Sequence, residues 1–228
     1  MFIFKRSDNG EEIKTPENWS EVTLGFYIDF FDVVEDLNNK LQEEVDELEG
    51  DIGIMQIVTR YPNHFKKIVA LLTGIDEKVI DQLSFESLIS FWSIASRFLK
   101  VPKQKKITRF KFDNEWYYMP KSKKDILGNE APMSEATFGD TIEALQIESL
   151  DAKIINNKLS ALPYQIAIMC RKKGESYDAE KIRMRAKKFK SLTMDVVWDI
   201  SFFLTKQKVT LLSHILNYSK EGEMAKKT

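Results

Sequence analysis

The sequence has one cysteine, two histidines and no long apolar run, and each shortage excludes a class of protein. The lone Cys170 excludes an internal disulfide, and with it the disulfide-stapled secreted domains. No window approaches the roughly 18 uninterrupted apolar residues of a membrane span, so no membrane partner is expected. The opening "MFIFKRSDNG" lacks the charged stretch, apolar core and cleavage site of a secretory signal. We therefore expect synthesis in a reducing cytoplasm.

Catalytic and metal-binding patterns are also missing. Neither His64 nor His214 lies at metal-ligand spacing from Cys170 or from a recognisable acidic pair. There is no glycine-rich phosphate loop and no G-x-S-x-G turn. Cys170 ends an apolar run, which favours a buried inert thiol, and His64 in "YPNHF" is typical of a helix start or a surface position. The sequence predicts a protein that is not an enzyme and holds no cofactor or metal ion.

What is present is the composition of a folded protein with an uneven charge. Of 228 residues, 43% are apolar and 30% charged, and 15 Phe and 4 Trp supply large core side chains. Residues 1–105 hold 12 Lys/Arg against 19 Asp/Glu, a net −7, whereas residues 106–228 hold 22 against 16, a net +6. This separation favours head-to-tail contacts between copies or a contact between the halves.

The N-terminal segment predicts a β-hairpin followed by a helix. "FIFKR" and "EEIKTP" are short extended stretches on either side of an Asn-Gly turn signal, and Pro16 ends the second. A helix over about residues 22–39 follows, capped by Ser20 or Thr23. Its apolar residues recur at helical spacing: Leu24, Ile28, Phe31 and Val34.

The same order recurs in the middle of the chain. "ITRFKF", "DN" and "EWYYMP" predict a second hairpin closed by Pro120, and a polar loop leads to a helix start at Ser134. That start, "SEATFG", repeats "SEVTLG" at residues 20–25, so that Gly139 matches Gly25. The helix face expected after it contains Phe138, Ile142, Leu145 and Leu150.

Further landmarks favour an internal duplication. "LSFESL" from Leu83 and "LTMDVV" from Leu192 both open with Leu, a Ser or Thr cap and an early acid. The hairpins, the Ser-Glu helix starts and these later helices recur at offsets of 108, 114 and 109 residues. The alternative is that helix caps use few residue types, so echoes arise without duplication.

The fold class expected is therefore α+β, mainly α. Two related units, an acidic one at residues 1–105 and a basic one at 106–228, would each contain a hairpin followed by a helical bundle. The remaining helical runs are "GIMQIVTRYP", "HFKKIVALLTG", "NNKLSALPYQIAIMCRKK", "DAEKIRMRAKKFKS" and "KVTLLSHILNYSK".

Two charged segments are candidate contact surfaces. The acidic run at residues 42–51 lacks the alternating oxygen ligands of a calcium loop, and is a solvated helix end, a loop or a patch for a basic neighbour. The basic run at residues 179–190 predicts an amphipathic helix, with a solvated or protein-contacting face favoured over nucleic acid because the whole chain is nearly neutral. Its basic residues are Lys181, Arg183, Arg185, Lys187, Lys188 and Lys190.

The aromatic end of the second hairpin is the other candidate surface. Trp and Tyr suit interfaces because they bury a large area while keeping one polar atom hydrated. Strand alternation places Tyr117 on the face opposite Trp116 and Tyr118, so one face of an isolated hairpin needs a partner. The alternative, for about half of these aromatics, is core packing against the helix that follows the hairpin. The interface candidates are Trp116, Tyr117, Tyr118, Lys187, Lys188 and Lys190.

At "FKFDNEWYYMP…MSEATFGDTIEAL" the sequence resembles small proteins encoded in the structural gene block of tailed bacteriophages. In those proteins a hairpin ending in aromatics precedes a "TFG"-type helix start. The Lys-, Ile- and Asn-rich composition is also similar to that of crAss-like phages, whose virions carry ring-shaped adaptors below the portal, and cargo proteins. The resemblance covers about 35 residues and transfers no functional residue.

The resemblance implies a non-enzymatic virion protein of the neck or tail, a ring or adaptor subunit. Its partners would be portal, ring or tail proteins, and it would form a homo-oligomer located in the virion. The alternatives are a tail-assembly chaperone or scaffold not retained in the virion, and a nucleic-acid-binding regulator using residues 179–190.

Overall fold

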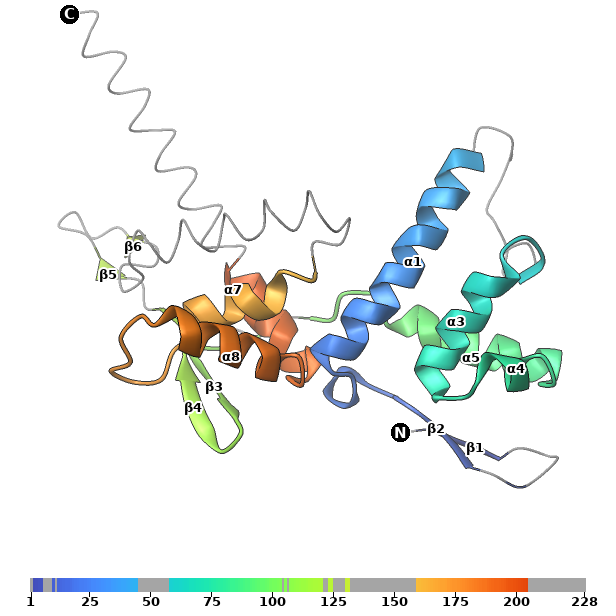
Figure 1. Ribbon diagram of the computed structural model, residues 1–228, viewed down its shortest axis with the longest axis horizontal. Coiled ribbons are helices and arrows are strands. Elements are labelled where there is room, and N and C mark those ends of the chain that lie inside the picture. Colours follow the sequence, from blue (N-terminus) through green and yellow to red (C-terminus); the bar gives the residue numbers. More distant parts are fainter. Residues whose placement is uncertain are drawn as a thin grey trace, which may run out of the picture. The chain divides into compact units, whose positions relative to one another are not determined.

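The computed structural model shows an α+β protein that is mainly helical, as the sequence predicted (Figure 1). It describes residues 2–5, 10, 12–44, 58–103, 105, 107–120, 123–124, 130–131 and 159–204. The chain divides into two compact units, Met1–Pro102 and Lys103–Thr228. The boundary lies three residues before the one expected from charge and sequence repeats.

The first unit opens with the expected hairpin. Strands β1 (Phe2–Lys5) and β2 (Glu12–Thr15) pair antiparallel, with Phe2 opposite Thr15 and Lys5 opposite Glu12. Gly10 has a φ of 71°, a left-handed conformation that glycine adopts at no steric cost. Along β2, Ile13 is buried and Lys14 exposed, as the alternation of side chains across a strand requires.

A short turn of helix and a long helix follow the hairpin. Asn18 caps the 3₁₀ turn η1 (Trp19–Glu21) by accepting a hydrogen bond from the Ser20 N–H at 3.0 Å. Helix α1 (Leu24–Glu44) starts after Thr23, whose hydroxyl accepts from the Phe26 N–H at 3.3 Å. Thr23 is therefore the confirmed cap, and α1 runs five residues beyond the predicted end, to Glu44.

A short helical stretch at residues 58–60 and three further helices follow in the described part of the first unit. Helix α3 (Pro62–Thr73) ends at Gly74, whose φ of 68° gives a left-handed cap. Helix α4 (Glu77–Ile80) is one turn capped by Asp76, and helix α5 (Phe85–Arg97) is capped by Ser84. Helix α3 packs against both α1 and α5. The largest buried side chains of this core are Phe30, Phe65, Phe91 and Phe98, and Ile68 and Ile80 are also fully buried.

The second unit places a hairpin against helices. Strands β3 (Arg109–Phe112) and β4 (Glu115–Tyr118) pair antiparallel, and helices α7 (Leu162–Met169) and α8 (Ala179–Phe189) pack on each other beside them (Figure 1). Residues 194–204 are helical, with Met194, Val197 and Ile200 buried. The segment expected to be a polar loop contains a further short antiparallel pair of strands, β5 (Lys123–Lys124) and β6 (Glu130–Ala131). The sequence did not predict this pair, because the segment has no alternation of apolar and polar residues.

Two predicted helices, at residues 134–150 and 208–220, lie outside the described residues. Gly139 falls in the first of them, so the internal duplication and the matched glycines stay predictions. In the described part of the chain, no helix is long and apolar enough to cross a membrane.

Candidate functional site

The candidate site is built on the β3–β4 hairpin. Asp113 and Asn114 form its two-residue turn, with φ values of 50° and 62°. Two successive left-handed residues make the tight turn whose twist matches that of the flanking strands. This pairing places Phe110 opposite Tyr117 and Lys111 opposite Trp116.

One face of the hairpin is fixed to α8 by aromatic packing. Phe110 and Tyr117 stack with ring centroids 5.5 Å apart, and both meet Phe189 edge-on at 5.8 and 5.1 Å. Phe112 also meets the edge of Phe189, at 5.3 Å. Burial raises the pKa of the Tyr117 hydroxyl above its usual value. Tyr117, one of the interface candidates, is thus part of the unit's own core.

The opposite face of the hairpin carries cations and aromatics. Arg109 and Lys111 of β3 share it with Trp116 and Tyr118 of β4 because directly paired residues point the same way. Trp116 is 44% exposed, and the Arg109 guanidinium lies 4.4 Å from its ring centroid. Sequence reasoning missed Arg109 and Lys111, although counting across the two-residue turn pairs both with the aromatics.

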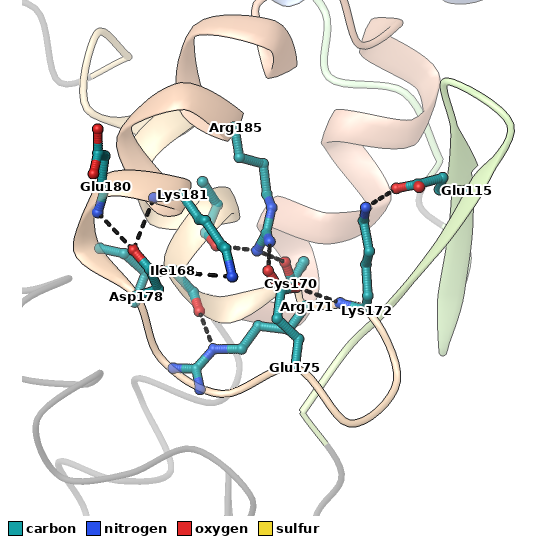
Figure 2. A network of polar contacts seen from close by, with 11 residues as sticks. Glu115, Ile168, Cys170, Arg171, Lys172, Glu175, Asp178, Glu180, Lys181 and Arg185 are labelled. Carbon is teal, nitrogen blue, oxygen red and sulfur yellow. Dashed lines mark hydrogen bonds and ion pairs between the residues drawn. The ribbon is translucent and has the colours of Figure 1, made fainter.

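Arg185 is the polar centre of the second unit (Figure 2). Its Nη1 donates to the carbonyls of Ala167 and Cys170 at 3.2 Å each, at the C-terminal end of α7, and its Nη2 forms an ion pair with Glu175. The guanidinium also lies 5.3 Å from the Tyr117 ring centroid. A cation is favourable at the C-terminal end of a helix, where the helix dipole is negative. Together, the contacts of Arg185 join α7, α8 and the hairpin.

The burial of Arg185 corrects one part of the sequence interpretation. The sequence pattern places Arg185 among the basic residues of a solvated or partner-contacting face at positions 179–190. In the structure its side chain is only 7% exposed. The signal was present, because Ile182, Arg185, Ala186 and Phe189 fall on one helical face, and all four are buried. A buried guanidinium needs paired acceptors, and Glu175 with two carbonyls supplies them.

A smaller ion pair sits at the edge of the same network. Lys172 pairs with Glu115 of β4, and this contact raises the pKa of the lysine (Figure 2). Asp178 caps α8 by accepting from the N–H groups of Glu180 and Lys181 at 3.0 and 3.1 Å. The Lys181 backbone hydrogen bond is the main cause of the lowered pKa of Asp178.

The remaining basic residues of α8 and its cap are exposed. Lys188 lies 3.6 Å from Asp113 of the hairpin turn, whereas Lys187 and Lys190 have no ion-pair partner among the described residues. Met184 is 60% exposed between them and the N-terminus of the helix. The three lysine candidates are therefore exposed among the described residues, and their role in an interface stays a prediction.

Cys170 and His64, the residues whose catalytic role the sequence argues against, have defined surroundings. Cys170 is fully buried, and burial raises the pKa of its thiol to about 12, so it is not a nucleophile at neutral pH. His64 lies in the first turn of α3, and its Nε2 contacts two side chains of α1, Asp36 at 2.7 Å and Lys40 at 3.1 Å. Within the described ranges no three His, Cys, Asp or Glu side chains gather as metal ligands would.

Comparisons of the chain with protein-family models, curated proteins and solved structures found no match. The geometry of the second unit is therefore the basis for any functional conclusion. The acidic run at residues 42–51 falls outside the described residues beyond Glu44, where α1 ends.

Proposed function

We propose that the protein is a non-enzymatic structural component of a tailed-phage virion, a ring or adaptor subunit of the neck or tail that acts through protein–protein contacts. The observation that carries the proposal is Trp116, exposed on a hairpin whose other face is fixed to Phe189. Trp, Tyr and Arg are the residues over-represented among interface hot spots, and Trp116, Tyr118 and Arg109 gather on this face. The resemblance of "FKFDNEWYYMP" to phage structural-block proteins covers the same hairpin.

Rigidity supports a binding role for this face. Because the turn is tight and Phe110, Phe112 and Tyr117 are packed, the exposed side chains lose little conformational freedom on binding. A large aromatic side chain on a rigid hairpin loses less conformational entropy on binding than one on a flexible loop.

Mass spectrometry of purified virions tests the virion role. We expect the chain in amounts comparable with those of other neck and tail proteins. Its presence in infected-cell lysate but absence from virions would contradict the proposal and favour a tail-assembly chaperone or scaffold, which would use the same surface transiently.

The contact surface is tested by Trp116→Ala. Truncating a hot-spot aromatic costs about 2 kcal/mol or more, so association in copurified complexes should weaken at least about tenfold. Phe202→Ala is the matched control, because Phe202 is 45% exposed in the same unit but lies away from the hairpin sequence. Equal effects of both substitutions would contradict the assignment of the hairpin face.

Nucleic-acid binding is a second candidate, favoured by the exposed Lys187 and Lys190. Neutralising phosphates releases counterions, so binding to random DNA would weaken steeply as salt is raised. Salt-insensitive or absent DNA binding leaves the protein-contact proposal as the function that fits.

A further inference from the structure

In the described part of the second unit, strand β3 has an open backbone edge. The two-residue turn makes Phe112 and Glu115 the closing pair of the ladder, and Met119 donates to the Thr108 carbonyl at 3.0 Å. In an antiparallel ladder the backbone N–H and C=O groups of successive residues alternate: those of one residue bond the partner strand, and those of the next point away from it. Arg109 and Lys111 therefore direct their N–H and C=O groups away from β4, and no backbone group within the described residues pairs with them.

The corresponding edge of β4 is already used. The Tyr118 N–H donates to the Arg171 carbonyl at 2.8 Å, and the Arg171 N–H donates back at 3.4 Å. Because Tyr118 stands opposite Arg109 in the ladder, this bridge also confirms which groups point outward. Among the residues that the structure describes, the hairpin thus has one edge closed by Arg171 and one edge, that of β3, without a backbone partner.

The open edge has a defined preference for side chains. A strand added beside β3 would place alternate residues opposite Arg109 and Lys111, where opposite charges are favourable and like charges are not. The residue between those two would fall on the face of Phe110 and Phe112, of which Phe112 is only half-buried. The edge therefore fits an extended acidic–apolar–acidic segment.

We propose that residues 45–51 of a second copy of this chain, which follow the end of α1, bind as an added strand along β3. This segment, "VDELEGD", contains the required pattern as Glu47-Leu48-Glu49. It belongs to the half with a net charge of −7, and the edge belongs to the half with +6. The inference deepens the proposed function and rests on it, because it names one contact through which copies assemble.

Nucleic acid is the less favoured occupant of this edge. A base would need the face of Trp116, which the Arg109 guanidinium already covers at 4.4 Å on one side. A nucleic acid also offers no ladder of backbone donors and acceptors to match those of Arg109 and Lys111. An acidic peptide satisfies the backbone groups and the charges together.

The first experiment measures binding of a fluorescently labelled peptide, residues 45–51, to the full chain by anisotropy. Lys111→Pro removes the outward N–H while sparing the hairpin ladder, since Pro is tolerated where the N–H faces away. We expect Lys111→Pro to weaken binding at least about tenfold, and Lys111→Ala, which keeps the N–H, to weaken it only several-fold. Equal effects of the two substitutions, or no binding by the wild type, would overturn strand addition.

A charge exchange keeps the test decisive if Lys111→Pro disturbs folding, which its urea midpoint would reveal. The double variant Arg109→Glu with Lys111→Glu should lose the wild-type peptide and bind one carrying Glu47→Lys and Glu49→Lys. Failure of the exchanged pair to recover binding would overturn the proposal. Labelled oligo(dT) that binds the wild type and loses affinity in the Arg109→Glu, Lys111→Glu variant, with no binding of the acidic peptide to the wild type, would replace it with a nucleic-acid interface.

The outcome is separable from that of the proposed function. Presence of the chain in virions without peptide binding at β3 would reject only this contact. Absence from virions together with peptide binding would reject the virion role and leave the strand-addition site intact.

Discussion

Arg185 lies in the basic segment by sequence but inside the fold by structure. The guanidinium has two carbonyl acceptors at the end of α7 and one carboxylate, so its charge is compensated where it is buried. A planar group with five donors suits this arrangement, and a lysine ammonium would not reach all three acceptors. Its role is to join the elements that present the hairpin.

We expect Arg185→Met to destabilise the second unit. Removing one partner of a buried pair leaves Glu175 and two carbonyls without their donor, which typically costs about 3–5 kcal/mol. Urea unfolding of the full chain measures the loss. Arg183→Met, on the exposed side of the same helix, should change stability by no more than about 0.5 kcal/mol. Similar losses for both variants would mean that Arg185 contributes through helix propensity alone.

For single residues, the sequence predicted burial and orientation better than it predicted which distant residues would be in contact. The inert state of Cys170 followed from its apolar run, and the opposite orientations of Trp116 and Tyr117 followed from strand alternation. The bonds of Arg185 to Ala167 and Cys170 could not be predicted, because they join residues whose approach depends on how α7 and α8 pack.

The elements of the described chain follow local signals closely. Asp113 and Asn114 adopt the left-handed conformation that the turn demands, and Asn and Asp tolerate it better than most residues. Helices α3, α5 and α8 begin or end at the Pro, Ser, Asp and Gly signals of the sequence. The unpredicted β5–β6 pair and the length of α1 show where such signals are weak or missing.

The turn gives a matched pair of substitutions at Asn114. Asn114→Gly should be neutral or slightly stabilising, because glycine adopts a φ of 62° without steric cost. Asn114→Val should destabilise by about 1–2 kcal/mol, because a β-branched residue is strained in the left-handed region. Both remove the amide, so a difference in urea midpoint reports the backbone alone. Equal midpoints would show that the turn conformation changes freely.

The contact between α1 and α3 gives a prediction for acid unfolding. Hydrogen bonds from His64 and then Lys40 lower the pKa of Asp36 below its usual 3.8. A lowered pKa means that the folded state favours the carboxylate, so this stabilisation is present above pH 3.8 and is lost as the pH falls through the lowered pKa.

We therefore expect Asp36→Asn to unfold more readily than the wild type at neutral pH and to lose that difference in acid. Urea midpoints measured from pH 7 down to about pH 2.5 would show the two curves converging. Asp29→Asn, which removes an exposed carboxylate of the same helix, is the control for helix effects. Parallel curves for wild type and Asp36→Asn would mean that the contact adds nothing to stability.

For the molecule as a whole, charge separation is the property that sequence alone describes best. The net −7 and +6 of the two halves need no coordinates, and the division of the chain into Met1–Pro102 and Lys103–Thr228 nearly coincides with the change of sign. What sequence could not supply is which cations are available to a partner. Arg185 is occupied internally, whereas Lys187 and Lys190 face solvent without a described ion pair.

Lys187, Lys188 and Lys190 are exposed and can meet a neighbouring chain, whereas the buried Arg185 cannot. Copies in a closed ring present different faces to each neighbour, so an acidic half can meet the basic half of the next copy. Exposed ion pairs contribute only about 0–1 kcal/mol each, so the lysines should set orientation and rate while the face around Trp116 supplies affinity. The charge-reversed variant must then leave Arg185 in place.

Changing Lys187, Lys188 and Lys190 to Glu should slow assembly without unfolding the protein. The slowing should be greatest at low salt, because charges more than about 10 Å apart are screened near 0.1 M ionic strength. Light scattering during assembly gives the rate, and the triple change to Gln, which removes charge without reversing it, should give an intermediate rate. Acids in the last turn of α8 oppose its dipole at about 0.3–1 kcal/mol each, so urea unfolding must accompany the measurement. An assembled structure in which residues 42–51 and 179–190 both face solvent, away from every neighbouring chain, would remove the basis for this prediction.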